Sequence, residues 1–361
     1  MFDRDMFNHD PYGLDKEAKQ RFLTERLQAL TIHHYNHCSL YARMMDAWPF
    51  ACDNPVTSYL ELPFLPVRLF KEYRLSSVDD SKIVEELNSS GTTGQTVSRI
   101  LLDDQTAEFQ SRLLSWTLAS HIGKSRLPMI VLDTQSILHN PQLFSARGAG
   151  ILGFSFLATD RIFALDDSMD FNVEGVRQFI DKHRNERILL FGFTFIIWQH
   201  VCMSLKKRGI RLDISNGQLF HGGGWKRMSE MSIDNSMFKT ELHDILGVKH
   251  VHNFYGMVEQ TGTIHIECSE GNLHAPDSAD IIIRRPKDYS VAEIGEEGII
   301  QACSIAPLSY PGHLLLTDDV GLILGVDDCP CKKKGTYFAI KGRIKHAELR
   351  GCSDSYAKHF E

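Results

Sequence analysis

The stretch between residues 128 and 254 alternates between short apolar segments and longer amphipathic ones, and this order constrains the fold more than any other feature of the sequence. The apolar segments have the length and composition of buried strands: Pro128–Leu132, Arg187–Phe191 and Lys249–Phe254. The amphipathic segments predict helices from Thr194 to Arg208 and from Met237 to Leu246. Alternation of strands and helices is typical of a layered α/β domain with a mainly parallel sheet.

The ends of these two predicted helices carry recognisable signals. Gly209 and Gly247 directly follow the last helical residues, where a left-handed glycine commonly ends a helix. Ser236 precedes the second helix and is its expected N-cap. Beyond residue 280 helix signals stop and short strands follow: Ile281–Arg284, Gly298–Ile305, Leu314–Leu324 and Tyr337–Lys341. This change predicts an antiparallel β subdomain built onto the α/β body.

Residues 16–47 show helical spacing of apolar side chains, and the prolines within residues 62–66 predict an extended connection. We therefore divide the chain into three parts. Residues 1–75 form an N-terminal helical segment packed on the body, residues 76–341 form the core, and residues 342–361 form a hinge with a flexible tail that carries a cysteine.

The composition limits the classes of partner and compartment. A net charge of -7 argues against nucleic acid as a partner, because phosphate binding favours a basic face. The N-terminus shows no signal peptide, and the longest apolar run, residues 188–198, is too short to span a bilayer. We expect a soluble, cytoplasmic protein without an integral membrane segment, and the sequence leaves homo-oligomerisation open. In that compartment the eight cysteines are thiols, metal ligands or a nucleophile rather than disulfides.

The strongest local motif is a run of hydroxyl and glycine residues made of Ser89, Ser90, Gly91, Thr92, Thr93 and Gly94. The two glycines permit a tight turn whose backbone N–H groups point inward, and the hydroxyls can add donors to phosphate oxygens. The lysine of a Walker loop is absent, so an ordinary P-loop nucleotidase is disfavoured. A polar surface loop is the alternative.

Further motifs follow in the sequence, each weak when taken singly. A glycine loop holds Gly222, Gly223 and Gly224, an aromatic–acidic element holds Tyr255, Gly256 and Glu259, and two late polar positions are Asp319 and Arg343. In this order the motifs resemble those of the adenylate-forming superfamily, which includes acyl-CoA synthetases, luciferases and peptide-synthetase adenylation domains. The resemblance implies the superfamily's α/β fold, with ATP and Mg²⁺ as cofactors.

The resemblance also implies roles. Residues 89–94 would hold the departing phosphates, and the glycine loop with Tyr255 would hold the adenine. Glu259 would bind Mg²⁺, and Asp319 with Arg343 would fix the ribose. Val258 stands where the superfamily usually has threonine, so a hydroxyl contact to phosphate is in doubt.

Typical members continue past the hinge at Arg343 with a lid domain that supplies a catalytic lysine, whereas this sequence stops at Glu361. We therefore expect the fold without the C-terminal lid, and nominate Lys226 as the cation at the α-phosphate. A surface lysine is the alternative.

The missing lid, the hydroxyl-rich loop, the segment from Pro63 to Pro66 and Cys352 near the C-terminus together resemble the acyl-protein synthetase (LuxE) family. This resemblance implies ATP-dependent activation of a long-chain fatty acid to acyl-AMP. The acyl group would then pass to Cys352, whose thiolate Arg350 would favour, and on to a partner such as an acyl reductase or transferase. A terminal thiol without a role is the alternative for Cys352.

A second group of cysteines sits in the β-rich region: Cys268, His274, Cys329 and Cys331. Three thiols and an imidazole suit tetrahedral Zn²⁺, but spacing alone does not separate a zinc site from buried thiols. The set also resembles that of phenylacetate-CoA ligase-like enzymes, and the resemblance implies a structural zinc.

Two other functions stay open, namely an acid–CoA ligase of the phenylacetate-CoA ligase type and a catalytically silent nucleotide-binding subunit. A zinc-stabilised interaction module is a more distant alternative. We assign simple structural roles to the remaining clusters. His33, His34 and His37 are expected on a solvated helix face, and the aromatic residues from Phe191 to Trp198 in the core, where some could contact the acyl chain. Four other cysteines are expected as core or surface thiols: Cys38, Cys52, Cys202 and Cys303.

Overall fold

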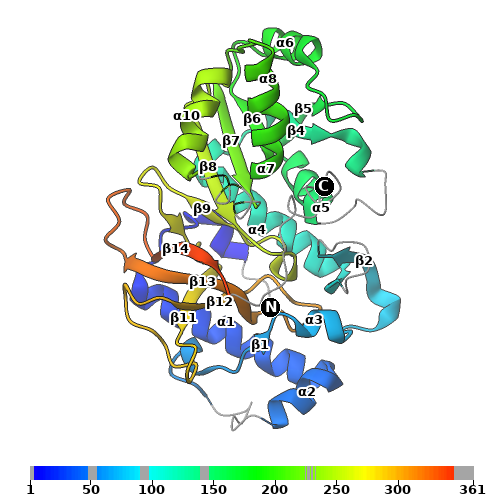
Figure 1. Ribbon diagram of the computed structural model, residues 1–361. Coiled ribbons are helices and arrows are strands. Elements are labelled where there is room, and N and C mark those ends of the chain that lie inside the picture. Colours follow the sequence, from blue (N-terminus) through cyan, green and yellow to red (C-terminus); the bar gives the residue numbers. More distant parts are fainter. Residues whose placement is uncertain are drawn as a thin grey trace. The chain divides into compact units, whose positions relative to one another are not determined.

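The computed structural model describes residues 4–47, 55–89, 97–138, 146–223, 225, 228, 231 and 233–344 (Figure 1). These residues fall into two compact units. The first unit comprises residues 4–89, 97–120 and 256–344, and the second comprises residues 121–255. The domain boundaries at residues 75 and 341 stay predictions.

The second unit is built on a parallel sheet. Its described strands are β4 (Leu127–Thr134), β5 (Ala158–Leu165), β6 (Ile188–Phe193), β7 (Gly217–Gly222) and β8 (His250–Tyr255). They lie in the order β5-β4-β6-β7-β8, and each adjacent pair is parallel. The chain therefore runs outward from β4 in one direction and then in the other, which is the doubly wound arrangement. The predicted parallel α/β body is confirmed.

Helices cover both faces of this sheet. They are α5 (Ala146–Ser155), α6 (Val173–Lys182), α7 (Thr194–Ile196), the π-helix η5 (Ile197–Met203), α8 (Ser204–Lys207) and α10 (Asn235–Leu246), with the short 3₁₀ helix η4 (Gln135–Leu138). Phe220 of β7 packs on Phe154 of α5, whereas the next residue, His221, packs on Phe238 of α10. Because neighbouring side chains of a strand point to opposite faces, α5 and α10 lie on opposite sides of the sheet (Figure 1).

The two predicted helices of this unit are present, with one correction. Gly209 and Gly247 have φ angles of 63° and 69°, the left-handed conformation expected of glycines that end helices. The N-cap of α10, however, is Asp234 and not Ser236. The helix begins two residues earlier than predicted, at Asn235, and the Asp234 carboxylate accepts a hydrogen bond from the backbone N–H of Met237 at 2.8 Å. Ser236 consequently lies inside the first turn.

The first unit contains the predicted antiparallel strands. They are β11 (Ala279–Arg284), β12 (Gly298–Ser304), β13 (Leu314–Val326) and β14 (Thr336–Arg343), followed by β10 (Leu273–His274) and β9 (His265–Glu267). The proline-flanked connection forms β1 (Leu65–Pro66), which pairs in parallel with β13. A separate hairpin joins β2 (Ile83–Asn88) to β3 (Arg99–Asp103).

The first unit also contains helices, some of which bury apolar side chains against this sheet. The longer ones are α1 (Lys16–His37), α2 (Ser39–Asp46) and α4 (Asp104–Ile122), and the short ones are η1 (Arg4–Asn8), η2 (Tyr59–Glu61), α3 (Leu69–Glu72), η3 (Asp80–Lys82) and η6 (Val258–Gln260). Leu23 and Leu27 of α1 share one core cluster with Leu113 of α4 and Leu314 of β13. A bilayer-spanning helix needs about 20 apolar residues, and no described helix provides such a stretch.

The prediction that the histidines of α1 lie on a solvated helix face is wrong for His34. Its side chain is fully buried, with Nδ1 2.8 Å from the hydroxyl of Ser77 and Nε2 3.2 Å from the carbonyl oxygen of Pro307. Helical spacing placed the three histidines near one another, but it did not show that the loop before β13 covers one of them.

Candidate active site and metal centre

Asp319 and Arg343 face each other in the β13–β14 ladder. The Nε of Arg343 donates a hydrogen bond to Oδ1 of Asp319 at 2.9 Å, and the two side chains are 26% and 18% exposed. The backbone N–H of Asp319 donates to the hydroxyl of Thr317, which itself donates to the carbonyl oxygen of Ile300. The pair is therefore held by the sheet while part of each side chain stays accessible to a ligand.

Glu259 sits in the short helix η6 and is only 5% exposed. The next residue fixes this turn, because the Nε2 of Gln260 donates to the carbonyl oxygens of Ala302 and Gly312 at 3.1 and 2.9 Å. A carboxylate oxygen is the ligand that Mg²⁺ prefers, so a buried carboxylate on a fixed turn fits the predicted role. Val258, the departure from the superfamily pattern, is itself buried.

The glycine loop begins at the carboxyl end of β7. A Cβ at Gly222 would lie 2.9 Å from both the ring and the carbonyl oxygen of Phe254, so only glycine permits this close approach to β8. Gly223 follows with a φ of 71°, which also favours glycine. Tyr255 ends β8 and is half-buried. Gly224 and Lys226 lie outside the described residues.

Only the first position of the hydroxyl-rich motif is described. Ser89 closes the β2–β3 hairpin, because its N–H donates to the carbonyl oxygen of Ser98 and its hydroxyl accepts from the N–H of Ser98 at 2.8 Å. The other predicted phosphate-binding positions lie outside the described residues: Ser90, Gly91, Thr92, Thr93 and Gly94. The predicted acyl acceptor, Cys352, lies outside them as well.

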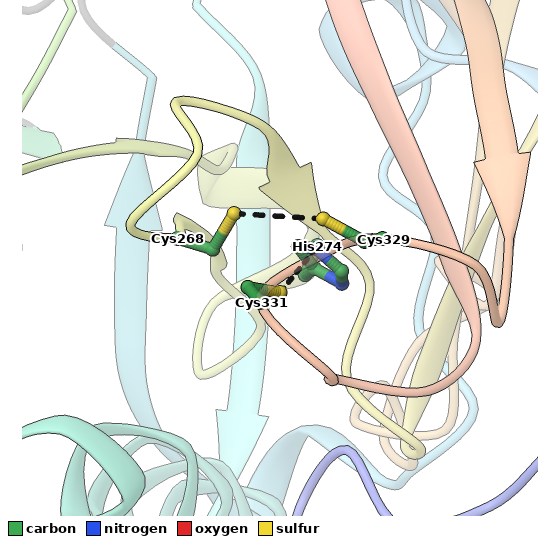
Figure 2. Close-up of side chains that lie close together, drawn as sticks. All are labelled: Cys268, His274, Cys329 and Cys331. Atoms are coloured by element: carbon green, nitrogen blue, oxygen red, sulfur yellow. Dashed lines mark hydrogen bonds between the residues drawn. The ribbon is translucent and has the colours of Figure 1, made fainter.

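The structure brings the four predicted zinc ligands together (Figure 2). Their ligand atoms all lie within 4.8 Å of one another, although Cys268 directly follows β9, His274 ends β10, and Cys329 and Cys331 lie in the β13–β14 connection. The two Sγ atoms of Cys268 and Cys329 are 3.9 Å apart, and the Sγ of Cys331 is 3.3 Å from Nε2 of His274. A tetrahedral zinc would separate two thiolates by about 3.8 Å and a thiolate from an imidazole nitrogen by about 3.6 Å.

Aromatic residues hold the histidine of this cluster in place. The ring of His274 stacks on Tyr337 at 5.5 Å and meets Tyr12 edge-on at 6.1 Å. Lys333 lies over the ring of Tyr12, with its Nζ 3.8 Å from the ring centroid. Burial, with a smaller contribution from Lys333, lowers the pKa of His274 to about 4. The imidazole is therefore neutral at pH 7, the form that binds a metal ion.

The other described cysteines are poor nucleophiles. Cys38, Cys202 and Cys303 are buried, and burial raises the pKa of both Cys202 and Cys303 far above the ordinary value. They are core thiols, as expected. Cys52 lies outside the described residues.

Three buried contacts between polar side chains carry no signal in the sequence. Arg147 of α5 binds the buried carboxylate of Asp133 at the carboxyl end of β4. Thr194 bonds to the buried ring of His221, and Gln110 bonds to the hydroxyl of Tyr310. No motif signals such pairs, because their members are widely separated in sequence and belong to common residue types.

Comparison with known proteins identifies the family of the chain. The model of the acyl-protein synthetase family, LuxE, matches residues 1–361. The chain belongs to this family. The long-chain-fatty-acid–luciferin-component ligase of Vibrio harveyi is 23% identical over 353 residues, 95% of this chain and 89% of the relative. The protein of the same name from Aliivibrio fischeri is 24% identical over 306 residues, 82% of this chain and 78% of the relative.

The fold of a solved enzyme structure agrees with this family assignment. The open conformation of 2-hydroxyisobutyryl-CoA ligase, in complex with 2-HIB-AMP and CoA, superposes with a TM-score of 0.72. The alignment has 14% identity and covers 94% of this chain and 78% of that chain. At this identity the likeness shows the fold alone, which is that of adenylate-forming enzymes. The family and its relatives show that the chain is a ligase, and the solved structure shows its fold.

Proposed function

We propose that this acyl-protein synthetase uses ATP to activate a long-chain fatty acid as acyl-AMP and then transfers the acyl group to its own Cys352. The family match over residues 1–361 carries the proposal. The names of the Vibrio and Aliivibrio relatives support the fatty acid as substrate.

In the first step a carboxylate oxygen of the acid attacks the α-phosphorus of ATP, and the bond from this phosphorus to the bridging oxygen breaks, which releases pyrophosphate. Asp319 and Arg343 would hold the ribose, while Gly222, Gly223 and Tyr255 would hold the adenine. Glu259 would bind Mg²⁺, which neutralises phosphate charge when bound. Positioning and charge neutralisation would therefore supply most of the catalysis.

In the second step the thiolate of Cys352 attacks the acyl carbon, and the bond from this carbon to the AMP oxygen breaks. The products are an acyl-enzyme thioester and AMP, and the thiol proton goes to solvent. A partner protein, an acyl reductase or transferase, would then accept the acyl group. The burial of Cys38, Cys202 and Cys303 supports the choice of Cys352, since a thioester must be reached from outside.

Intact-protein mass spectrometry tests this sequence of steps. The protein is incubated with Mg·ATP and fatty acids of several lengths, as wild type, as Cys352→Ser and as the matched control Cys38→Ser. We expect a hydroxylamine-labile acyl adduct on wild type and on the control, and none on Cys352→Ser. Acyl-AMP without an adduct would contradict the second step and favour the acid–CoA ligase alternative, which added coenzyme A would then reveal. ATP binding without acid-dependent exchange would favour a silent subunit.

We also propose Lys226 as the cation that neutralises the α-phosphate. Its place two residues after Gly224, the last residue of the glycine loop, supports this role. Lys226→Ala should abolish acyl-adenylate formation, measured as acid-dependent ATP–pyrophosphate exchange, whereas Lys207→Ala, in an exposed helix turn, should retain it. Near-normal exchange by Lys226→Ala would contradict the proposal.

We infer further that Cys268, His274, Cys329 and Cys331 bind a structural Zn²⁺. The distances of 3.9 and 3.3 Å among their ligand atoms, close to those of a tetrahedral site, support this inference. The chemistry of the set fits as well, because three thiolates with one neutral imidazole are typical structural zinc ligands. Such an ion would join the β9–β10 hairpin to the β13–β14 connection.

A further inference from the structure

Gln110 of α4 and Tyr310, in the connection between β12 and β13, form a fully enclosed polar pair. The two side chains are 2% and 0% exposed, and the Nε2 of Gln110 donates to the hydroxyl of Tyr310 at 3.2 Å. The other amide atom, Oε1, has no hydrogen-bond partner within the described part of the chain. Exchanging the two amide atoms would leave the nitrogen unpartnered instead. Burying a polar atom without a hydrogen-bond partner costs free energy, and a leucine at position 110 would avoid that cost. The presence of glutamine therefore calls for an explanation beyond packing.

The backbone of α4 at Gln110 and the loop that follows Tyr310 lie against the segment that carries Glu259, from two sides. Gly262 has a φ of 86°, and a Cβ there would lie 2.6 Å from both Cα and the carbonyl oxygen of Gln110. On the other side, a Cβ at Gly312 would lie 2.8 Å from the carbonyl oxygen of Glu259 and would also meet the ring of Tyr310. The Glu259 turn is therefore pressed against α4 at Gly262 and against the Tyr310 loop at Gly312.

The pKa of Tyr310 depends on both Gln110 and Glu259. Burial is the main cause that raises the pKa of Tyr310, the bond from Gln110 opposes this effect, and the charge of Glu259 adds to it. The phenol therefore stays protonated at every physiological pH. The ring of Tyr310 also packs edge-on against Phe70 at 5.9 Å, which limits its movement.

From these contacts we propose that Gln110 and Tyr310 are positioning residues for Glu259, and that they set the affinity of this acyl-protein synthetase for its divalent cation. The inference rests on the proposed role of Glu259. Neither residue needs to touch the ion, because they act through the placement of the carboxylate. Residues that orient a metal ligand commonly change metal affinity by about 10–100-fold when they are replaced.

The test uses Tyr310→Phe and Gln110→Met, which remove the polar atoms and keep the size. Thr117→Val is the matched control, since Thr117 is equally buried on the same helix. We measure binding of Mn²⁺, as a stand-in for Mg²⁺, by electron paramagnetic resonance in the presence of a non-hydrolysable ATP analogue. The Mg²⁺ dependence of ATP–pyrophosphate exchange and the thermal midpoint are measured in parallel.

We expect the two variants to bind Mn²⁺ about 10-fold more weakly, with the KM for the acid unchanged and the control at the wild-type value. In a Glu259→Gln background, adding Tyr310→Phe should weaken Mn²⁺ binding no further, because the residue acts through Glu259. A lower thermal midpoint with unchanged Mn²⁺ binding would show a purely structural pair and overturn the inference. If Glu259→Gln alone leaves Mn²⁺ binding unchanged, the proposed role of Glu259 fails first and the inference falls with it.

Discussion

Asp319 and Arg343 are paired residues of the β13–β14 ladder, and a hydrogen bond of 2.9 Å joins the Nε of Arg343 to Oδ1 of Asp319. The two positions belong to separate sequence motifs, 24 residues apart. Because Nε makes this bond, the guanidinium is held in one orientation while both side chains remain partly exposed. The arrangement suits a pair that binds neighbouring hydroxyl groups of one ligand.

Replacing Asp319 by Asn should therefore weaken ATP binding. In the proposed site, the variant would lose the charged acceptor for the ribose hydroxyls, and a hydrogen bond to a charged group contributes about 1.5–3 kcal/mol. We expect the KM for ATP to rise by about 10–100-fold with little change in the KM for the acid, as measured by ATP–pyrophosphate exchange. Asp318→Asn, at the adjacent position, is the matched control and should behave as wild type. An unchanged KM for ATP in Asp319→Asn would remove this residue from the nucleotide site.

If the cysteine–histidine cluster binds zinc as proposed, replacing one of its four residues should release the metal. We expect about one zinc per wild-type chain by elemental analysis and much less in Cys331→Ser, with a lower thermal midpoint, because bound metal stabilises only the folded form. Cys303→Ala is the control, as this buried thiol lies outside the cluster and its loss should leave the zinc content unchanged. Wild-type protein without zinc, or Cys331→Ser with a full equivalent, would contradict the assignment.

The ion pair between Asp133 and Arg147 should contribute far more to folding than a surface pair. Both side chains are buried, at 0% and 5% exposure, so Arg147→Met leaves an uncompensated buried carboxylate. We expect a loss of about 3–5 kcal/mol, seen as a large fall in the thermal midpoint. Arg184→Met, which removes the exposed partner of Asp181, should cost about 0–1 kcal/mol. Similar effects of the two substitutions would show that the buried carboxylate is neutralised in another way.

Much of the fold could be predicted because its signals are local. Strand length, helical spacing and terminal glycines such as Gly209 and Gly247 depend on residues close in sequence. The four residues of the cluster could be predicted to lie together for a different reason, since cysteine and histidine are chemically distinctive wherever they occur.

What could not be predicted depends on contacts between distant residues of ordinary type. The N-cap of α10 is Asp234 and not the predicted Ser236, because aspartate and serine suit that role about equally and both stand near the start of the helix. The partners of Gln110 and Asp133 become visible only once the strands and helices are packed. The same holds for His34, whose burial depends on Ser77 and Pro307.

The buried histidines His34 and His313 should make stability depend on pH. Their rings lie 4.9 Å apart, and burial is the main cause that lowers both pKa values, to about 3 for His313 and well below 6.5 for His34. Nearby His33 and His37 lower the pKa of His34 further. In the unfolded chain both rings regain ordinary values near 6.5, so the unfolded state binds more protons below that pH.

The protein should therefore keep its full stability above about pH 6.5 and lose stability as the pH falls from there towards 3, by up to about 1.4 kcal/mol per pH unit for each buried histidine. We expect His313→Gln to be less stable than wild type at pH 8 but to show a shallower fall of the urea midpoint between pH 7 and 5. The exposed His250→Gln is the control and should reproduce the wild-type slope. If His313→Gln fell as steeply as wild type, the acid sensitivity would have to come from other groups.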